Sequence, residues 1–125
     1  MKYYDLFVYG TLRRGGMYAD YLINSELIEE AYFLDGYALY DYQRWYPYMI
    51  KQSDSGVVGD IYRVNESTLA DLHELEGIEE LLFKFVYLKD HQFYTYLKYD
   101  ENLEELKYIK KGDWLSYHQE ITKNR

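Results

Sequence analysis

Residues 56–77 read GVVGDIYRVNESTLADLHELEG, a segment that contains a strand followed directly by a helix. Apolar and polar residues alternate over residues 56–64, which is typical of a half-buried β-strand. Asn65 is a suitable N-cap for a helix that runs from about Glu66 to Glu76. Gly77 is expected to end this helix, because glycine readily adopts the left-handed conformation just past a helix end.

The remainder of the chain predicts mostly strands. Asp35-Gly36 is predicted to form the tight turn of a hairpin, since glycine supplies the positive φ that such turns need. The stretch 45–50 contains the only proline and is expected near a rim, at an edge or a bend. Residues 100–107 are expected to form a short helical turn or a loop. Further strands are predicted at residues 3–9, 28–34, 37–41, 83–89 and 92–99, and a short helix at residues 17–22.

Five or six strands with one long helix between them indicate an α+β fold, in which a mixed sheet curls toward a small β-barrel with one or two short helices. The chain has 125 residues, and 48% of them are hydrophobic. This length and composition predict a single domain over residues 1–125.

Charge and composition exclude several classes of function. The net charge is −8 and no long Lys/Arg cluster occurs, so a nucleic acid is not expected as a partner. No apolar run is long enough to cross a membrane and the start lacks the features of a signal peptide, which predicts a cytoplasmic protein. The sequence has no cysteine, so thiol nucleophiles, disulfides and thiolate metal sites are excluded. Its 18 tyrosines are best explained by half-buried strands.

Glu76 is the first candidate for chemistry. A helix turns about 100° per residue, so Leu69, Leu72 and Leu75 share one face, and Glu76 falls within roughly 40° of the edge of that face. Loss of hydration there, together with the partial negative charge of the helix end, should raise the pKa of Glu76. A raised pKa suits a general base that must accept and return a proton near neutral pH. The alternative is an ordinary surface glutamate at a helix end.

The second candidate is the loop Tyr9-Gly10-Thr11-Leu12, which follows the first predicted strand and continues to Gly16. Successive main-chain N–H groups that turn off a strand end can form a concavity for an anion. Gly10 would let a ligand approach the main chain closely. A plain turn would have a similar sequence, and the spacing is not that of a phosphate-binding Walker loop.

Other catalytic arrangements fit the sequence poorly. His73, His91 and His118 have no ligand partners at helical spacing, so a metal site is not expected and these histidines should be solvated. The serines lack a G-x-S-x-G context, and the remaining glutamates are typical of a solvated surface.

The order of the motifs resembles the γ-glutamylcyclotransferase, or AIG2-like, family. That family has a Y-G-[ST]-L loop after its first strand, a G-x-[LIV]-[YF] strand, and a helix that ends in L-x-x-x-E-G with the catalytic glutamate. The matching segments are Tyr9-Gly10-Thr11-Leu12-Arg13, Gly59-Asp60-Ile61-Tyr62, Leu72-His73-Glu74-Leu75-Glu76-Gly77, Tyr46-Pro47 and Gly112-Asp113-Trp114.

This resemblance implies a small mixed barrel in which the loop and the glutamate face each other across a cavity. It also implies an enzyme without a cofactor that converts a γ-glutamyl amino acid or γ-glutamyl amine to 5-oxoproline and a free amine. Glu76 would be the catalytic base, and Tyr9, Gly10, Thr11 and Leu12 would bind the substrate. The chain departs from the family at Phe83-Lys84, where many members have a Tyr-Arg pair.

Two other classes of function remain alternatives. The first is a non-catalytic domain that binds a small molecule or a peptide with the same fold. The second is an interaction module whose sheet edge pairs with another chain. For the enzyme, a monomer or a weak homodimer is expected.

Overall fold

The computed structural model describes residues 2–44, 46–100 and 102–123. The strands are β1 (Tyr3–Val8), β2 (Glu26–Tyr42), β3 (Tyr46–Asn65), β4 (Phe83–Leu88), β5 (Phe93–Lys98) and β6 (Leu106–Tyr108). The helices are the 3-10 helix η1 (Ala19–Leu22), α1 (Glu66–Leu75) and α2 (Trp114–Lys123).

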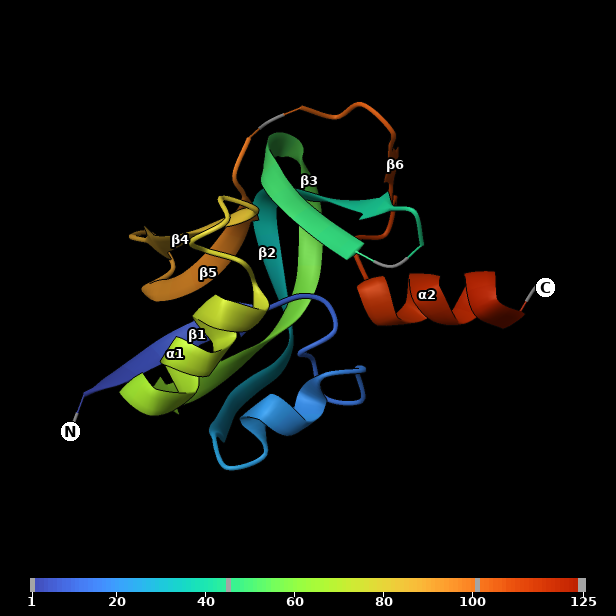
Figure 1. Cartoon of the computed structure of the whole chain (residues 1–125). Coiled ribbons are helices and arrows are strands. Elements are labelled where there is room, and N and C mark those ends of the chain that lie inside the picture. Colours follow the sequence, from blue (N-terminus) through green and yellow to red (C-terminus); the bar gives the residue numbers. More distant parts are fainter. Residues whose placement is uncertain (1, 45, 101, 124–125) are drawn as a thin grey trace.

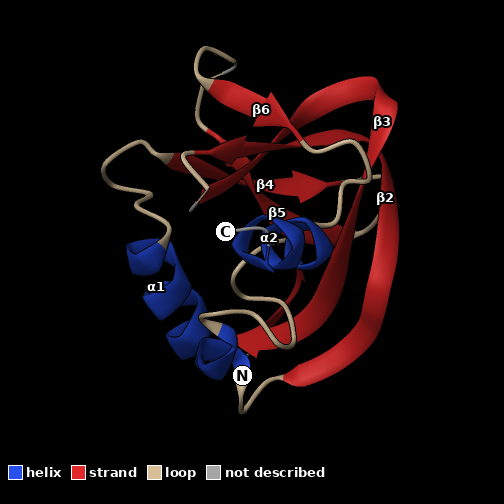
Figure 2. Ribbon diagram, turned by 90° about the vertical axis from the view of Figure 1, so that its right-hand side faces the viewer, coloured by secondary structure: helices blue, strands red, loops and turns tan. Residues whose placement is uncertain are grey.

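The strands form one mixed sheet in the order β4-β5-β1-β3-β2-β6. β1 and β5 are parallel, and the other neighbouring strands are antiparallel. The long strands β2 and β3 curve around one side of the molecule, and α1 lies on the opposite side (Figure 2). α2 extends from the sheet toward the C-terminus (Figure 1). The predicted class is confirmed: the fold is α+β, with a mixed sheet curled into a half-barrel and two α-helices.

β1 lies at the centre of the fold because both of its faces are apolar. Side chains alternate across a strand, so Leu6 and Val8 contribute to the cluster beneath α1. Phe7, followed by Tyr9 just past the strand, joins the cluster on the other face, which also contains Trp114 of α2. The end of β1 is therefore fixed from both sides, and the loop that follows it starts from a rigid position.

The local signals around α1 predicted its ends correctly. The Asn65 side chain accepts a hydrogen bond from the Thr68 N–H at 2.8 Å, as expected of an N-cap. The helix ends at Leu75 with Glu76 as its C-cap, and Gly77 has a φ of +67°.

The predicted hairpin at Asp35-Gly36 is wrong. Residues 28–34 and 37–41 belong to one continuous strand, β2, which pairs with β3 along most of its length. Gly36 does have a positive φ, of +86°, but it sits at a shift in register between Asp35 and Tyr37. A bulge and a tight turn both use such a glycine, and only the pairing with β3 distinguishes them.

Three other predictions need correction or restriction. The helix at 17–22 is a short 3-10 helix from Ala19 to Leu22. The last two residues of the supposed turn or loop at 100–107 belong to β6, which runs from Leu106 to Tyr108. The stretch 45–50 is part of β3 from Tyr46 onward, and Pro47 pairs with Asp41 of β2. Because β1 pairs with β3 only over residues 60–65, residues 46–50 have no partner strand on their other side within the described part of the chain, and the expected edge position is confirmed for them. Trp45 lies outside the described residues.

Candidate active site

A cavity of about 560 Å³ lies between the end of β1, the end of α1, the end of β2 and the start of β3. Its walls include all the residues predicted for the site: Tyr9, Gly10, Thr11, Leu12 and Glu76. Residues far apart in the sequence thus meet around one hollow, and its volume is in the range of roughly 300–1,000 Å³ that is usual for small-molecule sites.

Glu76 enters this cavity because of how α1 packs. Leu69 and Leu72 are buried in the cluster under the helix, and Leu75 packs against the same cluster. The next residue is therefore carried to the edge of the apolar face, where the Glu76 N–H still donates to the Leu72 carbonyl oxygen at 2.9 Å. Beyond it, the left-handed Gly77 turns the chain away, so the Glu76 side chain is left at the cavity wall.

Burial raises the pKa of Glu76 to about 7. The carboxylate keeps some solvent access through the cavity, but the surrounding protein reduces its hydration and favours the protonated form. In the described part of the chain, this carboxylate takes part in no ion pair. A carboxyl group with this pKa can both accept and donate a proton near neutral pH.

Tyrosine hydroxyl groups surround the carboxylate. The Tyr9 hydroxyl donates to the Tyr96 carbonyl oxygen at 2.6 Å, and the Tyr96 hydroxyl shares a hydrogen bond of 2.9 Å with His73 Nδ1. Burial, followed by the nearby negative charge of Glu76, raises the pKa of both tyrosines. Both hydroxyl groups therefore stay protonated, and the two tyrosines lie beside the Glu76 carboxylate.

The loop after β1 offers unpaired main-chain donors. Within the described residues, the N–H groups of Thr11 and Leu12 have no hydrogen-bond acceptor, whereas the Arg13 N–H donates to the Gly10 carbonyl oxygen at 3.1 Å. The Leu12 side chain is buried in the core, so only its main chain is available to a ligand. Such a pair of N–H groups can bind a carboxylate without a cation.

Gly10 has a second role besides close approach of a ligand. A Cβ atom at this position would lie 2.4 Å from Cγ of Pro47, so the absence of a side chain lets the proline ring pack against the loop. This contact connects the Tyr9-Gly10-Thr11-Leu12 loop to the Tyr46-Pro47 segment.

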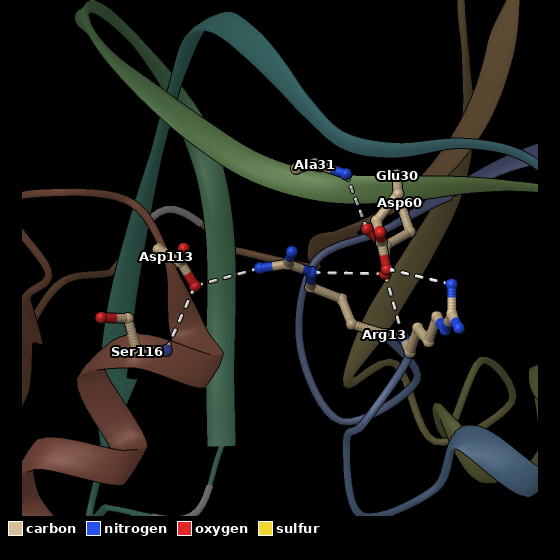
Figure 3. Close-up of polar contacts among 7 residues, drawn as sticks. Arg13, Glu30, Ala31, Asp60, Asp113 and Ser116 are labelled. Atoms are coloured by element: carbon tan, nitrogen blue, oxygen red, sulfur yellow. Dashed lines mark hydrogen bonds and ion pairs between the residues drawn. The ribbon is translucent and has the colours of Figure 1, made fainter.

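A buried ion cluster holds the far end of the loop (Figure 3). The Arg13 side chain lies between Asp60 and Asp113, with Nε 3.4 Å from Asp60 Oδ2 and Nη1 3.0 Å from Asp113 Oδ1. Asp60 is fully buried and also accepts hydrogen bonds of 2.9 Å from the N–H groups of Arg14 and Ala31. Arg13 thus links the loop to Asp60 in the Gly59-Asp60-Ile61-Tyr62 motif of β3. It also links the loop to Asp113 in the Gly112-Asp113-Trp114 motif at the start of α2.

Sequence reasoning missed several features of the site. The partnership of Arg13 with Asp60 and Asp113 joins residues 47 to 100 positions apart, which no local pattern reveals. Tyr96 and Tyr48 were indistinguishable from the other tyrosines of the strands. The expectation of solvated histidines is wrong for His73, whose ring lies 4.7 Å from that of Phe85 and whose pKa is lowered by burial.

Within residues 2–44, 46–100 and 102–123, no group of three or more His, Cys, Asp or Glu residues could hold a metal ion. Over those same residues, none of the helices has the length and apolar character required to span a bilayer.

Comparison with known proteins identifies relatives along almost the whole chain. The family described as "Gamma-glutamyl cyclotransferase, AIG2-like" matches residues 6–116. The gamma-glutamylcyclotransferase family protein YtfP of Escherichia coli K12 is 30% identical over 111 residues, which cover 88% of this chain and 95% of that protein. A Vibrio cholerae protein, provisionally named a gamma-glutamylcyclotransferase, is 42% identical over 73 residues. This second alignment covers 58% of the chain and only 62% of the Vibrio protein.

Solved structures agree in fold. An uncharacterized protein from Pyrococcus horikoshii superposes with a TM-score of 0.78 at 24% identity, over 98% of both chains. The solution structure of ytfP from Escherichia coli gives a TM-score of 0.71 at 27% identity, over 90% of this chain and 97% of that one. With the motifs and the cavity that they surround, these matches show that the chain belongs to the gamma-glutamyl cyclotransferase, AIG2-like family.

Proposed function

We propose that the protein converts a γ-glutamyl amide to 5-oxoproline and a free amine, with Glu76 as the general base. The observation that carries this proposal is the carboxyl group of Glu76, which lies in the cavity wall with a pKa of about 7. Thr11 and Leu12, whose N–H groups have no hydrogen-bond acceptor within the described residues, line the same cavity.

The substrate's α-carboxylate is held by the main-chain N–H groups of the Gly10 to Leu12 loop. This contact places the α-ammonium group toward Glu76 and folds the glutamyl chain, so that the α-nitrogen approaches its own γ-carbonyl carbon. Such an intramolecular arrangement is a large part of the catalysis, because well-oriented groups reach effective molarities on the order of 10⁵ M or more.

Proton transfer then follows from the pKa of Glu76. The carboxylate accepts a proton from the α-ammonium group, and the freed amine attacks the γ-carbonyl carbon to form a tetrahedral intermediate. Glu76 returns the proton to the leaving nitrogen, and the bond between the γ-carbon and that nitrogen breaks. The ring nitrogen gives its second proton to the Glu76 carboxylate, which passes it to the released amine, so that this product leaves as an ammonium ion. No atom changes oxidation state and no water is consumed, so the steps require no redox cofactor.

We also propose that this enzyme is a single cytoplasmic domain that acts as a monomer or a weak homodimer. Its oligomeric state can be measured by analytical ultracentrifugation across a dilution series. A tight dimer whose sheet edges pair would favour the interaction module instead.

The direct test is mass-spectrometric detection of 5-oxoproline after incubation with a panel of γ-glutamyl amino acids and amines. Glu76→Gln keeps the shape of the side chain but cannot accept the proton, so it should form no product. Glu74→Gln is the matched control, because Glu74 is exposed on the same helix outside the cavity and its variant should retain activity. Binding without product by the wild type would favour the non-catalytic binding domain.

A further inference from the structure

The cavity extends beyond the part that a γ-glutamyl group would occupy. Its second half is formed by the end of β2, the start of β3 and the residues at the start of β4, and it adjoins the loop after β1 where Pro47 packs against Gly10. The lining residues of this half are Tyr42, Tyr46, Pro47, Tyr48, Leu82 and Phe83.

The aromatic rings in this half form a continuous wall. The centroid of the Tyr42 ring lies 6.4 Å from that of Tyr46 and 6.1 Å from that of Tyr48. The ring centroids of Tyr48 and Phe83 are 5.3 Å apart. Leu82 and Tyr46 are 55% and 56% exposed at the mouth. Apolar side chains that are exposed together around a cavity mark a surface that binds an apolar group.

The charges of the cavity restrict what this group can carry. Among its described lining residues there is no Lys, Arg or His, and Glu76 is the one acidic residue. A substrate's α-carboxylate can use the N–H groups of Thr11 and Leu12, but a second carboxylate would find no cation in the lining. It would also lie in the same cavity as the Glu76 carboxylate, in a protein with a net charge of −8.

One cation that lies close to the wall is already engaged. Lys98 Nζ lies 5.7 Å from the centroid of the Tyr48 ring, and it binds both the carboxylate and the carbonyl oxygen of Asp100. Its charge is therefore paired outside the cavity lining.

We infer that the second half of the cavity is the subsite for the leaving amine and that it selects an aromatic amine without a carboxylate. This inference rests on the proposed function, which leaves the group attached to the γ-glutamyl unit open. The phenyl ring of such an amine would stack on the wall of Tyr42, Tyr48 and Phe83, with Tyr46 at the mouth.

Four synthetic amides separate the contributions of ring and charge. γ-Glutamyl-phenethylamine is compared with γ-glutamyl-phenylalanine, which adds a carboxylate; with γ-glutamyl-ethylamine, which lacks the ring; and with γ-glutamyl-cadaverine, which carries a cation. The kcat/KM for 5-oxoproline formation should be highest for the phenethylamide, by about tenfold or more over each of the others. Equal or better turnover of any of the other three would overturn the inference while leaving the proposed function intact.

Tyr46→Ala tests the wall itself. Tyr46 is exposed, so its removal should leave the fold intact and reduce the ratio of phenethylamide to ethylamide turnover by about fivefold. Tyr87→Ala is the matched control, because Tyr87 is a similarly exposed strand tyrosine, at 51%, that does not line the cavity. An unchanged ratio in Tyr46→Ala would remove this residue, and with it the proposed wall, from substrate selection.

The two proposals can fail separately. If none of the four amides yields 5-oxoproline, the proposed function fails, and calorimetry on the wild type then tests the subsite alone. Tighter binding of the phenethylamide than of the other three compounds would support the subsite without catalysis. Equal binding, or no binding of any of the four, would overturn it.

Discussion

Asp60→Asn would remove the charge that anchors the loop after β1. In the wild type, this fully buried carboxylate pairs with Arg13 and accepts hydrogen bonds from the N–H groups of Arg14 and Ala31. The asparagine keeps the volume but leaves the guanidinium group of Arg13, a residue only 6% exposed, with Asp113 as its remaining anion. Breaking a buried ion pair from one side costs about 3–5 kcal/mol, and we expect the lower value because the amide oxygen can still accept one hydrogen bond.

The free energy of unfolding, measured by urea denaturation, should therefore fall by about 3 kcal/mol, with a fall in melting temperature of about 10 °C for a domain of this size. Asp35→Asn is the matched control, because Asp35 is exposed on β2 and its variant should change stability by less than about 0.5 kcal/mol. Catalysis by Asp60→Asn should also weaken, since the loop that we propose holds the substrate loses its anchor. A loss of stability below about 1 kcal/mol would refute the anchoring role.

Three further predictions concern the cavity. The pKa of Glu76 is about 7 in the folded protein and 4.5 ordinarily, so the folded state binds this proton more tightly than the unfolded state does. The wild type should therefore lose up to about 3 kcal/mol of stability as pH rises from 4.5 to about 7. Glu76→Gln should lack this loss, as shown by urea unfolding at several pH values, and parallel pH curves for both proteins would contradict it. Gly10→Ala should destabilise by about 1–3 kcal/mol and reduce turnover, because its Cβ would overlap Pro47; unchanged thermal unfolding and kinetics would argue against this contact. Tyr96→Phe should cost about 1 kcal/mol in urea unfolding through the lost hydrogen bond to His73, and no change would mean that this bond is not stabilising.

The sequence alone predicted those parts of the fold that short-range chemistry determines. The N-cap at Asn65, the end of α1 before Gly77 and the strand before Gly10 all follow from residues within one or two turns of each other. For the same reason, the position of Glu76 at the edge of an apolar helix face could be derived from helical periodicity. Its raised pKa follows from that position.

Features that depend on distant parts of the chain could not be predicted in this way. Gly36 has the conformation that a hairpin turn requires, but the pairing of β2 with β3 makes it part of a register shift within one long strand. The ion cluster around Arg13 and the aromatic wall beside Phe83 each depend on strand pairing that brings separate segments together. Phe83 carries no hydroxyl group, and the side chains that line the same cavity include Tyr48 and Tyr96.

In the proposed reaction, the carboxyl group of Glu76, whose pKa is raised by burial, is the base for cyclisation. This role is tested most directly by the pH dependence of kcat/KM for 5-oxoproline formation, since this profile reports the pKa of the essential base in the free enzyme. The pH profile of kcat/KM should have an acidic limb with an apparent pKa of about 7. An acidic limb near the ordinary glutamate value of 4.5, or a profile that is the same in Glu76→Gln, would contradict it.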